Sequence, residues 1–136
     1  MRSLVLPLLL AACSGTGPAP PDSPDAAPGG LALTTDAAEY APGAAVAVTF
    51  RNTSGAEVAL SQPLGCVAVE REAPGGWTPV PTGRVCGAVL VPVASGAGET
   101  TTLEAPAEAG TYRLAQTVYP DGGDGVTVTS APFRVR

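Results

Sequence analysis

The fold of this chain is decided by the stretch Ala45-Val46-Ala47-Val48-Thr49-Phe50-Arg51. Its larger apolar side chains stand at every second position, at Val46, Val48 and Phe50. Successive side chains of a β-strand point to opposite faces, so this alternation places those three in a core. Ala47, Thr49 and Arg51 then face solvent. The stretch therefore predicts a β-strand with one buried face.

Similar short apolar runs continue on both sides of this stretch, and turn residues separate them. The other predicted strands are Leu31–Asp36, Ala56–Ser61, Cys66–Glu72, Trp77–Val80, Ala88–Val93, Glu99–Glu104, Thr111–Tyr119 and Val126–Arg136. Tyr40-Ala41-Pro42-Gly43, Asn52-Thr53-Ser54-Gly55 and Ala73-Pro74-Gly75-Gly76 have the composition of turns. No stretch shows the 3.6-residue apolar period of a capped helix. Seven to nine short strands in about a hundred residues predict an all-β, antiparallel β-sandwich.

Two aromatic positions make the prediction more specific. Tyr112 lies in Gly110-Thr111-Tyr112-Arg113-Leu114, where a tyrosine corner places its tyrosine, and Trp77 opens a strand after a glycine turn. Together with Tyr40–Gly43 and Asn52–Gly55, these motifs resemble the immunoglobulin-like domains of bacterial exported lipoproteins. The resemblance implies an immunoglobulin-like sandwich over residues 31–136, with Trp77 covering one end of its core. It implies no catalytic residue.

The N-terminus has the order of a secretory signal, with Arg2, a short apolar run and then small residues. Leu10-Ala11-Ala12-Cys13 resembles the lipobox of bacterial lipoproteins. That resemblance implies a signal peptide over residues 1–12 and diacylglycerol and palmitate on Cys13. The apolar run is shorter than the ~20 residues that a transmembrane helix needs. An unlipidated secreted protein is the alternative.

Residues 13–30 join this cysteine to the predicted domain. The segment Ser14–Gly30 contains only Ser, Gly, Thr, Pro, Ala and Asp, so it has no side chain large enough to fill a core. We expect a disordered linker that tends toward extended polyproline II and lifts the domain from the membrane. With Ser14 after the cysteine, the resemblance places the protein in the cell envelope, at the outer membrane or facing the periplasm if the cell is Gram-negative.

The two remaining cysteines, Cys66 and Cys86, form an even pair in a chain predicted to be exported. Export favours oxidation, so we expect a disulfide between them rather than two buried thiols. The chain has no Cys-x-x-Cys motif, which argues against a redox-active role.

Composition excludes several kinds of chemistry. The net charge is −5, no Lys or His is present, and the arginines are scattered, so nucleic-acid binding is not expected. Without His, the chain has no Ser-His-Asp or Cys-His site and no common zinc or copper site. Asp121-Gly122-Gly123-Asp124-Gly125 has too few ligands for calcium and is predicted to be a hairpin loop. Glu70 and Glu72 are predicted to lie on an exposed strand face. We therefore expect no cofactor, no metal and no enzymatic activity.

The stretch that most resembles a recognition element runs from Thr78 to Cys86. Pro79 and Pro81 stiffen it, and we expect Arg84 to project beside the cysteine anchor. The sequence favours a membrane-anchored, non-catalytic binding or structural module, with an envelope protein as a candidate partner. The alternative is a protease inhibitor that acts through the Pro79–Cys86 loop. Pro120–Gly125 is the second candidate binding loop, and Asn52-Thr53-Ser54 is interpreted as a turn rather than a glycosylation site.

Overall fold

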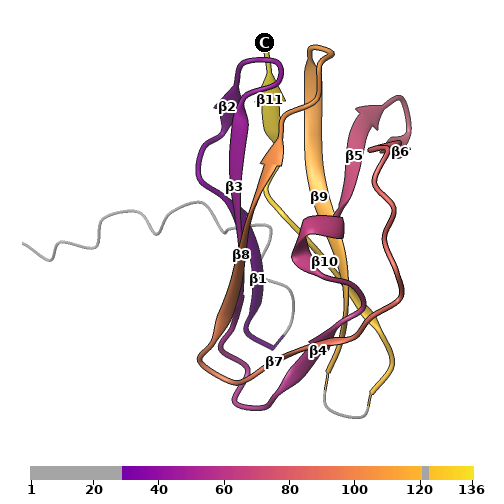
Figure 1. Cartoon of the computed structure of the whole chain (residues 1–136). Coiled ribbons are helices and arrows are strands. Elements are labelled where there is room, and N and C mark those ends of the chain that lie inside the picture. Colours follow the sequence, from indigo (N-terminus) through magenta and orange to yellow (C-terminus); the bar gives the residue numbers. More distant parts are fainter. Residues whose placement is uncertain (1–28, 121–122) are drawn as a thin grey trace, which may run out of the picture.

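The computed structural model describes residues 29–120 and 123–136, and these form two β-sheets packed face to face (Figure 1). The predicted signal peptide, Cys13 and the linker up to residue 28 lie outside the described residues. The first sheet has the order β1-β3-β8, with bounds Leu31–Thr35, Ala45–Asn52 and Gly98–Glu104. The second sheet contains β2 (Glu39–Tyr40), β4 (Val58–Leu60), β5 (Ala68–Ala73), β6 (Gly76–Val80), β7 (Val91–Val93), β9 (Gly110–Tyr119), β10 (Val126–Thr129) and β11 (Phe133–Val135). The prediction of an all-β fold is confirmed.

Strand β3 is the centre of the first sheet and behaves as its alternation predicts. It pairs antiparallel with β1 on one side and with β8 on the other. Val46, Val48 and Phe50 are buried, while Ala47 and Arg51 are exposed. Burial of these three side chains against the second sheet is the main local reason for the sandwich, because burying each large apolar side chain is worth about 1.5–3 kcal/mol.

Strand β9 is the centre of the second sheet. Its inward positions are Tyr112, Leu114, Gln116 and Val118, all buried. Strands β10 and β11 share one of its edges, and β4 and β5 share the other. A short 3-10 helix, η1 (Leu64–Cys66), separates β4 from β5. Strands β4 and β5 therefore pair with the same edge of β9, and η1 interrupts that pairing between them.

The tyrosine corner is confirmed in its geometry. The Tyr112 hydroxyl donates to the Glu108 carbonyl at 2.7 Å, four residues upstream, and the side chain is buried. The Tyr112 ring stacks on Phe133 with 6.0 Å between ring centroids, and Phe133 meets Tyr40 edge to face. This aromatic row fills one end of the core.

Tyr40 was predicted to open a turn, but it ends strand β2, which pairs parallel with β11. The Tyr40 hydroxyl donates to Asp36 Oδ1 at 2.6 Å, and the Ala47 N–H donates to the same oxygen at 3.0 Å. These two hydrogen bonds, with that of Tyr40 the stronger influence, lower the pKa of the Asp36 carboxyl below its usual 3.8. Burial raises the pKa of Tyr40, and the bond to Asp36 raises it further.

Several predicted strand bounds were wrong. Val126–Arg136 forms two strands because Ser130 Oγ accepts the Leu114 N–H at 2.9 Å between them, and Pro132 has no N–H to donate. The predicted strand Ala88–Val93 begins only at Val91, so Ala88–Leu90 belong to a loop. Cys66 lies in η1, not in β5.

The prediction that Trp77 covers the core was also wrong. Trp77 pairs with Glu72 in the β5–β6 hairpin, whereas Val80 pairs with the buried Val69. Directly paired residues share one face of a sheet, so this register turns Trp77 to the outer face. The Arg113 guanidinium lies over its ring, 4.5 Å from the centroid.

Candidate functional site

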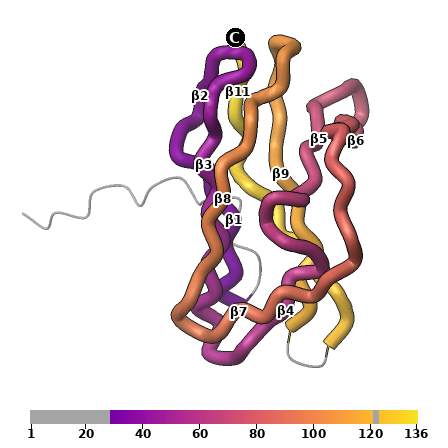
Figure 2. Tube along the Cα trace, viewed as in Figure 1, coloured from indigo at the N-terminus to yellow at the C-terminus, as the bar shows by residue number. Residues whose placement is uncertain are grey.

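The most exposed apolar segment that the structure describes is the loop from Pro81 to Leu90, called here the 81–90 loop. It connects β6 to β7 and runs along one edge of the molecule (Figure 2). Val85 is fully exposed at 102%, and Val89 and Leu90 are exposed at 57% and 63%. Single exposed apolar residues are ordinary, and it is the presence of three on one loop that makes this loop the candidate interaction surface.

The loop is attached to η1 through two successive contacts. Cys86 forms a disulfide with Cys66, with 2.03 Å between the sulfur atoms, so the predicted bond is confirmed. The Arg84 guanidinium donates to the Gly65 carbonyl. The two residues that flank Val85 thus contact neighbouring residues of η1, Arg84 with Gly65 and Cys86 with Cys66. Val85 lies between these two contacts and is exposed.

The predicted recognition residues do not all lie in the exposed part of the loop. Pro79 lies in β6, opposite Glu70, and Pro81 opens the loop. The Arg84 guanidinium turns back to the protein, and the adjacent Val85 extends into solvent. The sequence analysis included Val85 in the recognition loop without singling it out, and it placed Val89 and Leu90 in the predicted strand Ala88–Val93.

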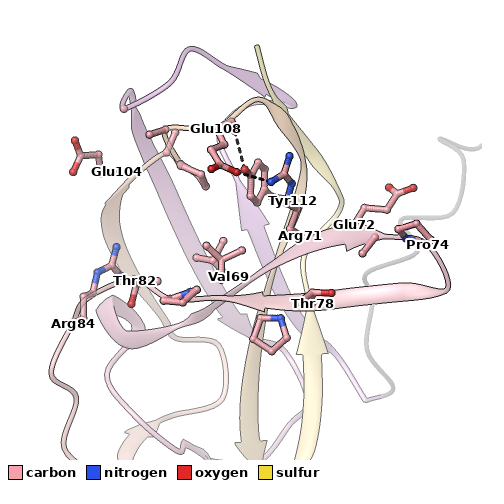
Figure 3. A pocket seen from close by; sticks show the side chains of 18 residues that line it. Val69, Arg71, Glu72, Pro74, Thr78, Thr82, Arg84, Glu104, Glu108 and Tyr112 are labelled. Carbon is pink, nitrogen blue, oxygen red and sulfur yellow. Dashed lines mark hydrogen bonds and ion pairs between the residues drawn. The ribbon is translucent and has the colours of Figure 1, made fainter.

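A groove of about 930 Å³ lies beside the start of this loop. The β5–β6 hairpin, residues 81–84 and the connection between β8 and β9 form its walls. Figure 3 shows Val69 near its middle, Arg84 and Thr82 at one end, and Glu72 and Pro74 toward the hairpin tip. Prolines, alanines and valines provide much of its lining. Its character is that of a shallow apolar surface with charged ends.

Arg71, in the groove wall, is already paired. Arg71 Nη1 lies 2.6 Å from Glu108 Oε2, and Arg71 Nη2 donates to the Ala109 carbonyl at 2.9 Å. Its guanidinium carbon lies 5.8 Å from the centre of the Tyr112 ring. These contacts tie the hairpin to the tyrosine corner, so Arg71 has a structural role in shaping the groove (Figure 3).

A second set of polar contacts lies on the outer face of the second sheet. Arg113 Nε donates to Glu70 Oε1 at 2.8 Å while its guanidinium covers Trp77. Glu70 is therefore held in an ion pair, and Glu72 is exposed, as the prediction of a strand face requires. An arginine between a carboxylate and an indole is an ordinary means of stabilising a sheet surface.

The Asn52 side chain is a structural clip, in agreement with the interpretation of Asn52–Gly55 as a turn. Asn52 is buried, and its Nδ2 donates to the Ala56 carbonyl at 2.8 Å and to the Val93 carbonyl at 2.9 Å. Its Oδ1 accepts from the N–H and the hydroxyl of Ser54 at 3.0 and 2.6 Å. An amide held in this way does not present its nitrogen for glycosylation.

Residues 121 and 122 of the predicted hairpin loop lie outside the described part of the chain. Among residues 29–120 and 123–136, no group of three or more His, Cys, Asp or Glu side chains is placed to hold a metal ion. Over the same residues, no helix has the length and apolar character needed to cross a membrane.

No protein-family model matches the chain, and no curated protein sequence matches it.

Proposed function

We propose that this protein is a lipid-anchored lipoprotein of the bacterial cell envelope, whose immunoglobulin-like domain is a non-catalytic binding module. The 81–90 loop is the surface that it presents to a partner protein. The observation that carries the proposal is the exposure of Val85, Val89 and Leu90 on one loop that a disulfide attaches to the domain. Fixing a loop before binding lowers the entropy that binding must overcome.

The immunoglobulin-like assignment rests on three features. Two sheets with short strands pack around one core, a tyrosine corner closes the connection before β9, and the connections place β9 between β10/β11 and β4/β5. In sandwiches of this type, loops that leave the sheets commonly carry the binding function, because the core holds them in place. The 81–90 loop leaves the second sheet between β6 and β7.

The location rests on the N-terminal sequence. Cleavage before Cys13 and attachment of acyl chains there would fix the protein to a membrane, since two or more chains anchor stably. The test is intact-mass analysis of protein extracted from the membrane fraction. We expect a chain that begins at lipidated Cys13, and a Cys13→Ala variant that leaves the membrane fraction. A mature chain without lipid on Cys13 would contradict the anchor.

The binding surface is tested by comparing proteins that co-purify from native membranes. The loop variant carries Val85→Ser, Val89→Ser and Leu90→Ser, and the matched control carries Tyr119→Ser and Val126→Ser. Tyr119 and Val126 are the other large apolar side chains that are exposed in the described residues. We expect a specific partner to be lost with the loop variant alone, at unchanged thermal stability. Loss with the control alone would place the site on the β9–β10 hairpin instead of the loop.

Protease inhibition is the second candidate for the same loop. The observation that favours it is the fixing of both neighbours of Val85, which leaves one side chain exposed in a constrained segment. Constrained loops of this kind bind in a protease cleft and are cut slowly.

A further inference from the structure

We infer that the 81–90 loop is a substrate-like inhibitory loop for an endopeptidase with a small apolar specificity pocket, and that Val85 is the side chain that enters this pocket. The inference rests on the proposed function, because it requires the loop to be the binding surface. It goes further in naming the class of partner and the residue that selects it.

The loop presents one side chain. Val85 is fully exposed, and its two neighbours are held to η1, Arg84 through the Gly65 carbonyl and Cys86 through Cys66. The disulfide restrains the chain on one side of Val85, and on the other side the Arg84 side chain adds a single hydrogen bond, so Val85 has fewer conformations to lose on binding than it would on an untethered loop. Val85 therefore meets a pocket at a smaller entropic cost than the same residue on a free loop.

The backbone of the loop is also available. In the part of the chain that the structure describes, the main-chain groups of Pro81–Cys86 make no hydrogen bonds to other main-chain groups. Further along the loop, the Val89 N–H donates to the Gly87 carbonyl. Gly83 has a φ of +68°, a left-handed conformation that redirects the chain just before Arg84. Peptide-binding clefts recognise extended segments by pairing with unpaired main-chain groups. The segment before the disulfide can supply such groups.

The side chains of the loop decide the choice of pocket. The Arg84 guanidinium is engaged with the Gly65 carbonyl, so the loop does not offer a cation to a pocket that contains a carboxylate. The free side chain is a small β-branched aliphatic one. Serine endopeptidases differ in which of these side chains they accept. Trypsin has an aspartate in its specificity pocket and accepts a cation, whereas elastase has a small apolar pocket.

The contacts on both sides of Val85 explain why such a loop inhibits. Hydrolysis of the Val85–Cys86 peptide bond consumes one water and leaves a carboxylate on Val85 and an amine on Cys86. Cys86 would stay attached to Cys66, and the chain before the cut would stay close through the Arg84–Gly65 contact. Because both new ends remain near the cleft, the bond re-forms more readily than the products separate. A loop without the disulfide lacks this restraint.

The test measures inhibition of pancreatic elastase and of trypsin by the purified full chain, with a chromogenic peptide as substrate. We expect near-stoichiometric inhibition of elastase, at least a 100-fold loss of inhibition in Val85→Asp, and no change in the control Val126→Asp. Val85→Arg should transfer inhibition from elastase to trypsin. A variant with Cys66→Ser and Cys86→Ser should be cut rapidly between residues 85 and 86, as detected by mass.

The inference is overturned if the wild-type chain inhibits neither enzyme and Val85→Arg gains no inhibition of trypsin. It is also overturned if the wild-type chain is digested as fast as the variant without the disulfide. Failure of the proposed function gives a different result. If the serine variant of the loop loses its membrane partner while elastase is unaffected, the binding module stands and the inhibitor does not. If that variant keeps every partner and the wild-type chain does not inhibit elastase, both proposals fail.

Discussion

Replacing Asn52 by alanine should destabilise the domain by about 2–3 kcal/mol. The Asn52 amide nitrogen donates two hydrogen bonds that join the end of β3 to the turn before β4 and to the end of β7, through the carbonyls of Ala56 and Val93. Each such bond contributes about 1 kcal/mol net, and a buried acceptor left unpaired costs 1–3 kcal/mol. Val93 is itself buried, so water does not easily replace the amide at its carbonyl.

The assay is urea denaturation of the full chain, followed by circular dichroism. For a domain of roughly 100 residues, this loss corresponds to a fall in Tm of about 10 °C or more. Ser54→Ala is the matched control, because the Ser54 hydroxyl lies at the more exposed side of the same network. We expect the control to lose about 1 kcal/mol or less. Equal losses in the two variants would refute the view that the buried amide nitrogen holds these strands together.

The remaining predictions concern single side chains. Tyr112→Phe should lower the free energy of unfolding by about 1 kcal/mol, measured by urea denaturation, because one buried hydrogen bond is lost; a neutral result would mean that the tyrosine corner bond is not stabilising. Trp77→Ala should lower it by about 1–2 kcal/mol, less than a core tryptophan would, since the ring is half-buried beneath Arg113; a loss above about 3 kcal/mol would place Trp77 in the core. The pKa of Asp36 is lowered in the folded state, so its stabilising contribution is present above about pH 4 and is lost as the pH falls through the lowered value. Urea midpoints between about pH 5 and pH 2.5 should therefore fall more in the wild type than in Asp36→Asn, and parallel curves would contradict the role of this carboxyl.

Much of the fold could be predicted from local patterns. Period two in Ala45–Arg51 predicted the central strand of the first sheet, because that strand buries one face. The tyrosine-corner motif around Tyr112 marked the start of the central strand of the second sheet. Strand β2 was not predicted because a strand of two residues is too short to show a periodicity. Its parallel pairing with β11 joins segments that lie far apart in the sequence, so no local pattern reveals it. The face of Trp77 depends on its pairing with Glu72, which no composition rule reveals.

The candidate site was predicted in part. An even pair of cysteines in a chain predicted to be exported was enough to expect the Cys66–Cys86 bond, which the structure contains. Which side chain of the loop projects depends on a contact between Arg84 and Gly65, nineteen residues apart, that only the folded chain brings together. From the sequence, the charged Arg84 was the expected recognition residue of the loop. In the structure its guanidinium donates to the Gly65 carbonyl, and the neighbouring Val85 is the more exposed side chain.

The central claim is that the 81–90 loop is where this protein meets its partner. The most direct test places a photo-crosslinking amino acid at position 85 in the producing cell, and at position 126 as a control on the other exposed apolar site. We expect a discrete crosslinked adduct in the membrane fraction from position 85 and none from position 126. An adduct from position 126 with none from position 85 would contradict it.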